Sequence, residues 1–251
     1  MAEEVVYGRN PVLALLRAGG RRVDEIAVLA GAQGPLAGIV ALARQAGVKV
    51  SYRTRDQLTA IAGSPHHQGV VARVASAAYV DLDALLETAR GRGEEPAFLL
   101  ALDQVQDPMN FGALLRTACS FGVHGVVIPK HHQVGLTPAA ARAAMGAVEA
   151  VPVARETNLV NALETMKKSG IWVYGATIAG GVPPWSADLR GPLCLVLGGE
   201  GEGLRPLVAR TCDVLITIPL SGVVGSLNVA AACAALCYEV ARQRSARPNP
   251  S

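Results

Sequence analysis

The sequence predicts an α/β protein whose parallel sheet is covered by helices on both faces. From residue 97 onward, strands that are apolar along their whole length alternate with helical stretches, which is typical of sheets buried on both sides. Hydrophobic residues make up 51% and charged residues 17% of the chain, which provides for a buried core and excludes a disordered protein. At roughly 150 residues per domain, a length of 251 residues allows one large domain or two modest ones.

The first 76 residues predict a small α/β domain built from short elements. A helix is expected from Asn10-Pro11 through residue 18, because proline suits the first helical position and Gly19-Gly20 ends the helix. Valine-rich stretches bounded by glycine predict strands. The later elements expected are a strand over 25–30, a helix over 36–46, a strand over 48–52, a helix near 55–62 and a strand over 69–75.

A change of composition marks the expected domain boundary. Residues 77–96 contain two basic and five acidic residues and end in the polar stretch RGRGEEP. Linkers between domains are commonly polar and rich in glycine and proline. We therefore expect domains at 1–76 and 97–251, joined by a linker at 77–96.

The second domain is expected to continue the alternation of strands and helices. Its elements in order are strand 98–103, helix 110–121, strand 125–128, helix 137–146, a strand near 151–153, helix 158–169, strands 171–177 and 193–197, a short helix from Arg205, strand 214–218 and a last helix from about Leu227. The last helix is apolar on every side through Cys237. Such a helix must be wholly buried or packed against another subunit.

Composition excludes several classes of function. Aromatic residues are only 4%, which argues against a stacking surface for single-stranded nucleic acid. The longest apolar run is far shorter than the ~20 residues of a membrane helix, and the acidic start lacks a signal segment, so the cytoplasm is expected. The cysteines form no CxxC pair, and buried thiols without a metal are expected at Cys119, Cys194, Cys212, Cys233 and Cys237.

The charge of the first segment leaves two interpretations open. Residues 1–76 hold nine basic and five acidic residues. A basic domain can meet a polyanion, but the same excess also fits an ordinary solvated surface.

The first motif is LDQVQDPMNFGALLRTA, residues 102–118. A turn at Asp107-Pro108 follows a strand, and Asn110 begins a helix. Arg116 lies one turn beyond Gly112 on the same face, so a ligand could lie beneath the guanidinium, beside amide donors at the helix start. A helix with one exposed arginine is the alternative.

The second motif is LCLVLGGEGEGL, residues 193–204, in which a buried strand runs into a glycine-rich loop. Glycines allow a ligand to approach the backbone closely. A dinucleotide fingerprint is disfavoured, because it belongs in the first strand–helix turn and is followed ~20 residues later by an acid, whereas residues 218–222 read IPLSG. A P-loop also fails, since no Gly-Lys-Ser/Thr follows. A binding loop and a tight turn both remain possible.

The third motif is ITIPLSGVVGSLNVAAACAALCYEV, residues 216–240. A strand ends at Pro219, a loop with Gly222 and Gly225 follows, and Ser226-Leu227-Asn228 opens the last helix. Serine and asparagine there are also good helix caps, which is the simpler interpretation.

Together, these three motifs resemble the SpoU/TrmH family of RNA ribose 2′-O-methyltransferases in the SPOUT superfamily, over residues 97–244. YGRNPVLALL near the start and HHQGVVARV at 66–74 resemble the family's RNA-binding domain of the ribosomal-protein L30 type. The resemblance implies a deep trefoil knot in the C-terminal domain and a homodimer with its active site near the interface. The two-domain form resembles the members that methylate a guanosine of 23S ribosomal RNA.

The resemblance also implies roles for individual residues. The family's catalytic positions fall on Asn110, Arg116, Glu200, Ser226 and Asn228. Those for S-adenosylmethionine, the implied cofactor, fall on Leu197, Gly198, Gly199, Gly201, Ile218, Leu220, Ser226 and Leu227. Arg116 is expected to orient and polarise the ribose 2′-hydroxyl, because a guanidinium hardly deprotonates in proteins.

Three other functions compete with this prediction. The chain could methylate transfer RNA within the same family, or be an RNA-binding protein without catalysis; the intact motif residues argue against the latter. A dehydrogenase is disfavoured by the late position of the glycine loop. The histidines His66, His67, His131 and His132 lie in expected loops without a metal-site partner set, and His67 could contact RNA.

Overall fold

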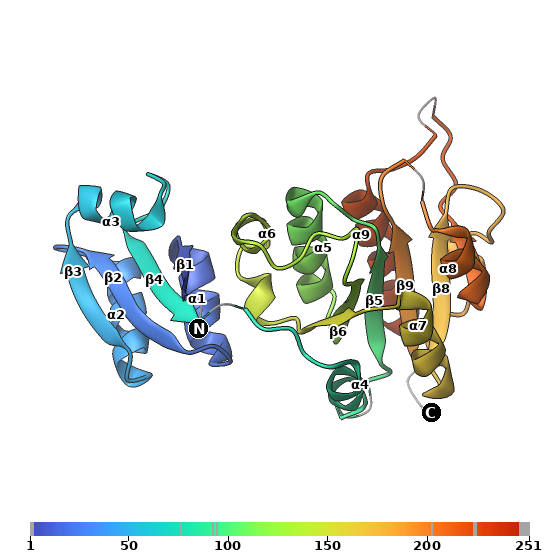
Figure 1. Cartoon of the computed structure of the whole chain (residues 1–251), viewed down its shortest axis with the longest axis horizontal. Helices are drawn as coiled ribbons and strands as arrows, with labels where there is room; N and C mark the ends of the chain where they lie inside the picture. The colour runs from blue at the N-terminus through green and yellow to red at the C-terminus, as the bar shows by residue number, and fades with distance from the viewer. Residues whose placement is uncertain are drawn as a thin grey trace. The chain divides into compact units, whose positions relative to one another are not determined.

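The computed structural model describes residues 3–75, 77–91, 93, 95–201, 203–222 and 225–245. The chain forms two compact units, which are drawn in Figure 1. The first unit combines Met1–Ala78 with Leu136–Ala150, and the second combines Tyr79–Gly135 with Val151–Ser251. None of the described helices is long and apolar enough to cross a membrane.

The first unit contains a mixed four-stranded sheet in the order β1-β4-β2-β3. β2 and β3 are parallel, whereas β4 is antiparallel to both β1 and β2. The strands are β1 (Glu3–Tyr7), β2 (Val23–Leu29), β3 (Lys49–Arg53) and β4 (Val70–Ala75). β1 was not among the expected elements. All of its residues pair with β4, an interaction that its short sequence does not predict.

Helices cover both faces of this sheet because its strands alternate. Ile26 of β2 belongs to the core under α1 (Arg9–Ala18) and α2 (Pro35–Gln45), while Ala27 belongs to the core under α3 (Arg55–Ala62). Thr54 and Gln57 form a capping box that starts α3.

A segment from the second half of the sequence completes the first unit. It contains α6 (Pro138–Ala143) and the 3-10 turn η1 (Ala147–Glu149). Arg21 forms ion pairs of 2.6 Å with both Glu4 and Glu149, and the three side chains are at most 10% exposed. Burial raises the pKa of Glu149, and the charge of Arg21 opposes this rise. Residues 136–150, expected within the 97–251 domain, therefore pack with the first unit.

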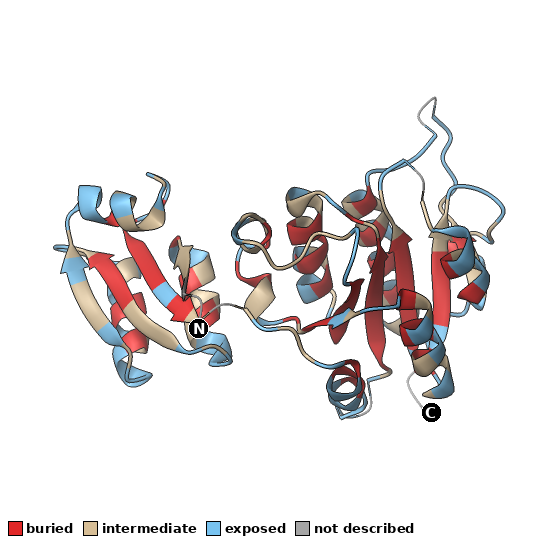
Figure 2. Ribbon diagram, viewed as in Figure 1, coloured by how far each residue is buried: buried red, intermediate tan, exposed pale blue. Residues whose placement is uncertain are grey.

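The second unit contains a six-stranded sheet in the order β10-β8-β9-β5-β6-β7. Every pairing is parallel, as the uniformly apolar strands predict. β5 is buried along its whole length, and the buried strands form the red centre of this unit in Figure 2. The strands are β5 (Phe98–Asp103), β6 (Gly125–Pro129), β7 (Val153–Glu156), β8 (Trp172–Thr177), β9 (Leu193–Gly198) and β10 (Val214–Thr217).

Helices cover the two faces of the parallel sheet. α4 (Leu82–Arg90), α7 (Leu159–Lys168) and α8 (Pro206–Thr211) bury side chains in the core of one face. α5 (Pro108–Ser120) and α9 (Val229–Ser245) pack against each other on the other face (Figure 1). A 3-10 turn, η2 (Pro184–Ser186), precedes β9.

α4 lies within the expected linker. Leu82, Leu85, Leu86 and Ala89 are buried in the core of the second unit. Their spacing is that of one helix face, a signal that the acidic composition of the segment masked. Residues 82–90 are therefore part of the second unit's packed core.

α9 is covered on one side only. It buries Val229, Cys233, Leu236, Cys237 and Val240. Ala231, Ala235 and Tyr238 form an exposed stripe along the helix, and Tyr238 is 62% exposed. The helix is thus partly buried within its own unit and presents an apolar stripe without a cover among the described residues.

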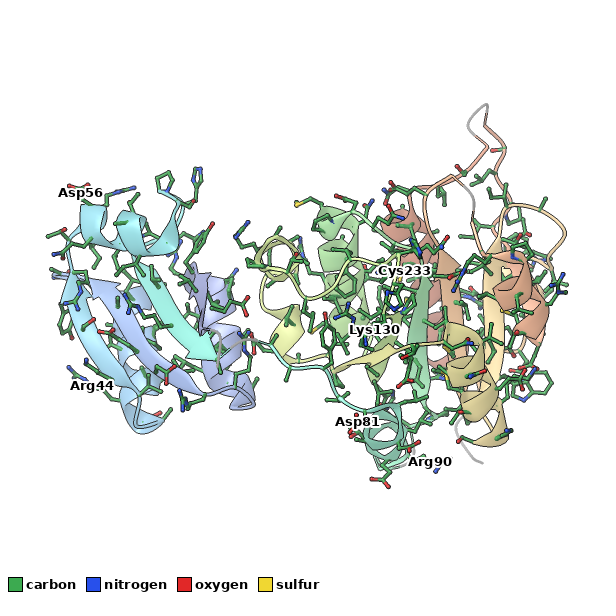
Figure 3. The ribbon with its side chains drawn as sticks, viewed as in Figure 1. Arg44, Asp56, Asp81, Arg90, Lys130 and Cys233 are labelled. Carbon is green, nitrogen blue, oxygen red and sulfur yellow. The ribbon has the colours of Figure 1, made fainter. Side chains whose placement is uncertain are left out.

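The cysteines divide by environment. Cys194, Cys233 and Cys237 are buried, and Cys233 is labelled on α9 in Figure 3. Burial raises the pKa of Cys212 to about 12, so its thiol stays protonated at neutral pH. Cys119 is exposed, which corrects the expectation that all five thiols are buried.

Candidate active site

Residues of the second and third motifs line one pocket at the carboxyl ends of the parallel strands. It is lined by the loop after β9 and by described residues between β10 and α9. We call it the first pocket. All eight residues expected to hold the cofactor line it: Leu197, Gly198, Gly199, Gly201, Ile218, Leu220, Ser226 and Leu227.

Glycine is required in the loop after β9 because backbone segments touch there. A Cβ atom on Gly198 would lie 2.1 Å from the carbonyl carbon of Gly203, and one on Gly199 would lie 2.3 Å from the carbonyl oxygen of Gln104. Gly201 and Gly203 have φ angles of 94° and 69°, which side chains disfavour. The loop is therefore a tight turn whose glycines also form the pocket wall.

A buried carboxylate fixes the far end of this loop. Asp103, at the end of β5, is fully buried. Its Oδ1 atom accepts a hydrogen bond of 2.8 Å from Arg205 Nε, and its Oδ2 atom accepts one of 2.9 Å from the Arg205 backbone N–H. The ion pair joins the ends of β5 and the glycine loop, which holds the wall of the pocket in place.

Three of the expected catalytic side chains form one hydrogen-bonded cluster. The Asn228 amide donates to Asn110 Oδ1 at 3.1 Å and to Glu200 Oε1 at 2.9 Å, and the Asn110 amide also donates to Glu200 Oε1. Asp107 caps α5 by accepting from the Asn110 backbone N–H at 2.8 Å, which places Asn110 at the helix start. One residue from each motif thus contributes to the cluster.

Ser226 and Arg116, the remaining expected catalytic residues, lie outside this cluster. Ser226 lines the first pocket. Arg116 is exposed on α5, almost two turns beyond Asn110, and has no hydrogen bond or ion pair among the described residues. Gly112, one turn before it, is buried. The structure therefore leaves the guanidinium available to a ligand without bringing it to the cluster.

A second pocket adjoins the first at the glycine loop. It shares Gly199, Glu200 and Gly203 with the first pocket. The rest of its lining comes from the turn after β5 and the start of α5: Gln104, Val105, Gln106, Asp107 and Asn110. Gln104 and Gln106 were not among the residues expected to form the site. The signal available was their place directly after a buried parallel strand, where ligands bind in open α/β sheets.

Part of the first pocket also escaped prediction. Thr177 and Ile178 line it from the end of β8, and Ala232 lines it from α9. The same rule about the carboxyl ends of parallel strands applies to β8. The close approach of Gly181, where a Cβ atom would lie 2.7 Å from the Leu215 backbone, shows how tightly this loop passes β10.

The histidines are not gathered into a site. Among the described residues, no group of three or more metal-ligating side chains lies together. His66, His131 and His132 are exposed. His67 is only 2% exposed, and its Nδ1 accepts the Gly69 N–H at 3.0 Å. Burial and the nearby charge of Arg55 lower the pKa of His67. The buried imidazole holds the turn before β4, which disfavours the predicted contact with RNA.

Two family models cover most of the chain. Residues 97–238 match the SpoU rRNA methylase family. The chain belongs to this family. In this SpoU protein, residues 5–80 match the substrate-binding domain of RNA 2′-O-ribose methyltransferases.

Curated relatives match this SpoU protein over nearly its whole length. A 23S rRNA (guanosine-2′-O-)-methyltransferase RlmB from Coxiella burnetii is 41% identical over 98% of both chains. The RlmB of Ralstonia nicotianae is 40% identical over 98% of both chains.

Solved structures share the fold. An rRNA methyltransferase from Sinorhizobium meliloti with bound AdoMet has a TM-score of 0.78 at 26% identity and covers 96% of this chain and 87% of that one. A structure on the 2-OH methylation of C/U34 in tRNA has a TM-score of 0.55 at 27% identity. It covers 99% of that chain but only 61% of this one, so the transfer-RNA protein matches a smaller part of the SpoU chain.

Proposed function

We propose that this protein transfers the methyl group of S-adenosylmethionine to the ribose 2′-hydroxyl of a guanosine in 23S ribosomal RNA. The observation that carries the proposal is the Asn110–Glu200–Asn228 cluster, whose Glu200 lines both of two pockets that share the glycine loop. Two substrates that must react with each other require adjoining sites of this kind. The RlmB relatives and the family model supply the reaction class and the target.

The first pocket fits S-adenosylmethionine. Leu197, Ile218 and Leu227 offer apolar wall to the adenine and the methionine hydrocarbon. Around Gly201 there is open space beside the backbone, which leaves peptide groups accessible to polar atoms of the ligand. The carboxylate of Glu200 lines the same pocket and complements a sulfonium charge. The AdoMet complex of the Sinorhizobium protein supports this assignment.

The reaction is an in-line displacement. S-adenosylmethionine supplies an electrophilic methyl group; the 2′-oxygen forms the new C–O bond as the C–S bond breaks, the sulfonium electrons return to sulfur, and the hydroxyl proton goes to solvent or an RNA phosphate. We assign alignment of the ribose to Asn110 and Asn228, whose amides are fixed on Glu200. Ser226 lies at the pocket wall, and Arg116 orients and polarises the hydroxyl.

The two-domain organisation favours ribosomal over transfer RNA. The RlmB relatives are covered over both domains, whereas the tRNA structure covers 61% of this chain. We assign RNA binding to the first unit, whose residues 1–76 hold nine basic and five acidic residues, and the chemistry to the second unit. We also propose a cytoplasmic location and a trefoil knot in the C-terminal domain.

We also propose a homodimer through α9. The exposed stripe of Ala231, Ala235 and Tyr238 is apolar and belongs to a helix that packs on α5, which carries Asn110 and Arg116. A second copy would cover the stripe and bring the two active sites near the interface. An exposed aromatic flanked by small residues suits such close helix packing.

A map of ribose methylation tests the proposed function. RNA from cells with and without the gene is compared by protection from alkaline hydrolysis, and the deleted strain is complemented with wild type or Arg116→Ala. We expect one guanosine of 23S RNA to lose protection on deletion and to regain it only with wild type. Purified Arg116→Ala should bind S-adenosylmethionine within about twofold of wild type, because Arg116 lies outside the first pocket.

Other outcomes of this experiment distinguish the alternatives. Loss of a transfer-RNA site keeps the chemistry and overturns the target. No change anywhere, with intact cofactor binding, favours the RNA-binding protein without catalysis. Equal losses of turnover and cofactor affinity in Arg116→Ala would contradict the role given to Arg116.

A further inference from the structure

The second pocket differs from the first in the chemistry of its lining. Its side chains include the amides of Gln104 and Gln106 and the carboxylates of Asp107 and Glu200. None of the described residues that line it is a lysine, arginine or histidine. Two carboxylates without a cation repel a phosphate group, so the pocket does not suit the RNA backbone. Amides and carboxylates are instead the groups that read the edge of a base.

Two amides in this pocket lack partners within the protein. Among the described residues, neither the Gln104 nor the Gln106 side chain makes a hydrogen bond, although Gln104 is half-buried. Polar groups that are withdrawn from water are normally hydrogen-bonded. Both side chains are therefore available to a ligand.

The turn that carries these glutamines is rigid. Gln104 has a φ angle of 67°, which is uncommon for a residue with a side chain. Gln133 Oε1 accepts the Val105 N–H at 2.8 Å, and Val134 N–H donates to the Val105 carbonyl at 2.9 Å. The Gln104 carbonyl also rests against Gly199. Backbone strain held by several contacts is characteristic of functional sites.

Ribose geometry connects this pocket to the reaction. The carbon that carries the base is bonded directly to the carbon that carries the 2′-hydroxyl. When that hydroxyl faces the first pocket at the cluster of Asn110 and Glu200, the base must lie beside the cluster. The cavity beside it, lined by the same two residues, is the second pocket.

We propose that the second pocket receives the base of the target nucleoside and that Gln104 and Gln106 read its edge, with guanine preferred over adenine. Guanine presents the N1–H and 2-amino donors side by side, which match carboxylate and amide acceptors. Adenine presents an unprotonated N1 there, and its lone pair faces the carboxylate of Asp107. This inference rests on the proposed function and names the residues that set its base specificity.

The experiment compares base preference in glutamine variants. Three 23S transcripts serve as substrates. They differ only at the mapped target position, which carries guanosine, inosine or adenosine. The proteins are wild type, Gln104→Ala, Gln106→Ala and Gln45→Ala, the last a control on an exposed glutamine of α2 in the other unit. The readouts are kcat/KM for methyl transfer and the affinity for S-adenosylmethionine by calorimetry.

We expect Gln104→Ala and Gln106→Ala each to lower kcat/KM for guanosine by about tenfold or more and to narrow the preference for guanosine over adenosine, as loss of a base-edge contact does. Cofactor affinity should stay unchanged, and Gln45→Ala should behave as wild type. Conservative Gln106→Asn should retain part of the preference. An unchanged guanosine-to-adenosine ratio in both alanine variants would overturn the inference and leave the proposed function standing. A wild-type protein that methylates no position would contradict both the inference and the proposed function.

Discussion

Glu200 contacts the other members of the cluster and both pockets through one side chain. Its Oε1 atom accepts both amides of the cluster, and its carboxylate lines both pockets. Two neutral donors fix a negative charge without neutralising it, so the charge can act on a cationic ligand in the first pocket. We therefore propose that Glu200 links the orientation of the nucleophile to recognition of the electrophile.

The charge of Glu200 predicts a difference between substrate and product. Glu200→Gln removes the charge and keeps the shape, so S-adenosylmethionine, a sulfonium, should bind about tenfold (~1.4 kcal/mol) more weakly. S-adenosylhomocysteine has a neutral sulfur and should bind nearly as before. Calorimetry with both ligands measures the split, and Glu164→Gln, an exposed residue of α7, is the control. Equal weakening of both ligands would show that Glu200 acts only through shape.

His67 predicts a dependence of stability on pH. Its pKa lies below the usual 6.5 in the folded state, chiefly because it is buried. The unfolded chain binds a proton near pH 6.5 and the folded chain resists it, so stability is complete above that pH and falls as the pH drops below it. Denaturant unfolding from about pH 7.5 to about 5.5 should show this slope, and His67→Asn should flatten it. The exposed neighbour provides the control: His66→Asn should keep the slope, and a slope unaffected by either variant would contradict the prediction.

At the scale of elements, patterns within one segment were predictable and pairings between segments were not. α3 follows the predicted 55–62, and β5 follows the predicted 98–103, because their caps and apolar runs are local. β1 carries no alternation that identifies it and exists through its pairing with β4. The last helix begins at Val229 rather than near Leu227, because Asn228 accepts the Ala230 N–H and forms the cap.

The residues of the site also divide into those that one segment of sequence predicts and those that depend on contacts between segments. The motif residues that line the first pocket could be named from the resemblance, because they lie within two short sequence motifs. Gln104 and Gln106 could not, because their importance arises only when the turn after β5 meets the glycine loop after β9. Arg116 could be named, but its distance from the cluster could not.

The exposed stripe of α9 predicts a dimer that one charge can disrupt. Tyr238→Glu places a carboxylate in an apolar interface, which costs several kcal/mol without a partner. Light scattering at micromolar concentration should give twice the chain mass for wild type and the chain mass for the variant. Trp172→Glu, an equally exposed aromatic at the start of β8, should leave the dimer intact. A monomeric wild type, or a dimeric Tyr238→Glu, would contradict the proposed interface.

At the scale of the whole molecule, each compact unit has its own core. The smaller unit depends on an ion-paired group that joins distant parts of the sequence, with Arg21 between Glu4 and Glu149. The larger unit holds both tryptophans, Trp172 and Trp185. Tryptophan fluorescence therefore reports on the larger unit, while circular dichroism reports on both.

Removal of Arg21 should weaken the smaller unit selectively. Arg21→Met leaves two buried carboxylates without a cation, which costs roughly 3–5 kcal/mol. Urea unfolding should show an early loss of circular dichroism with an unchanged fluorescence midpoint. Arg22→Met is the matched control, because Arg22 is 65% exposed in its pair with Asp24 and should change stability by about 0–1 kcal/mol. A common shift of both signals would mean that the two units unfold together.

The return of residues 136–150 to the first unit has a consequence for biosynthesis. Domains usually fold in order as they emerge during translation. Here, the first 78 residues emerge before Glu149 has been made. Arg21 and Glu4 therefore lack the cover of residues 136–150 until that segment has been synthesised. The first unit can therefore finish folding only after residues 136–150 have been made, and not when residue 78 emerges. A nascent chain halted before residue 149 should be cleaved by proteases in its first unit more readily than a nascent chain that extends beyond residue 150.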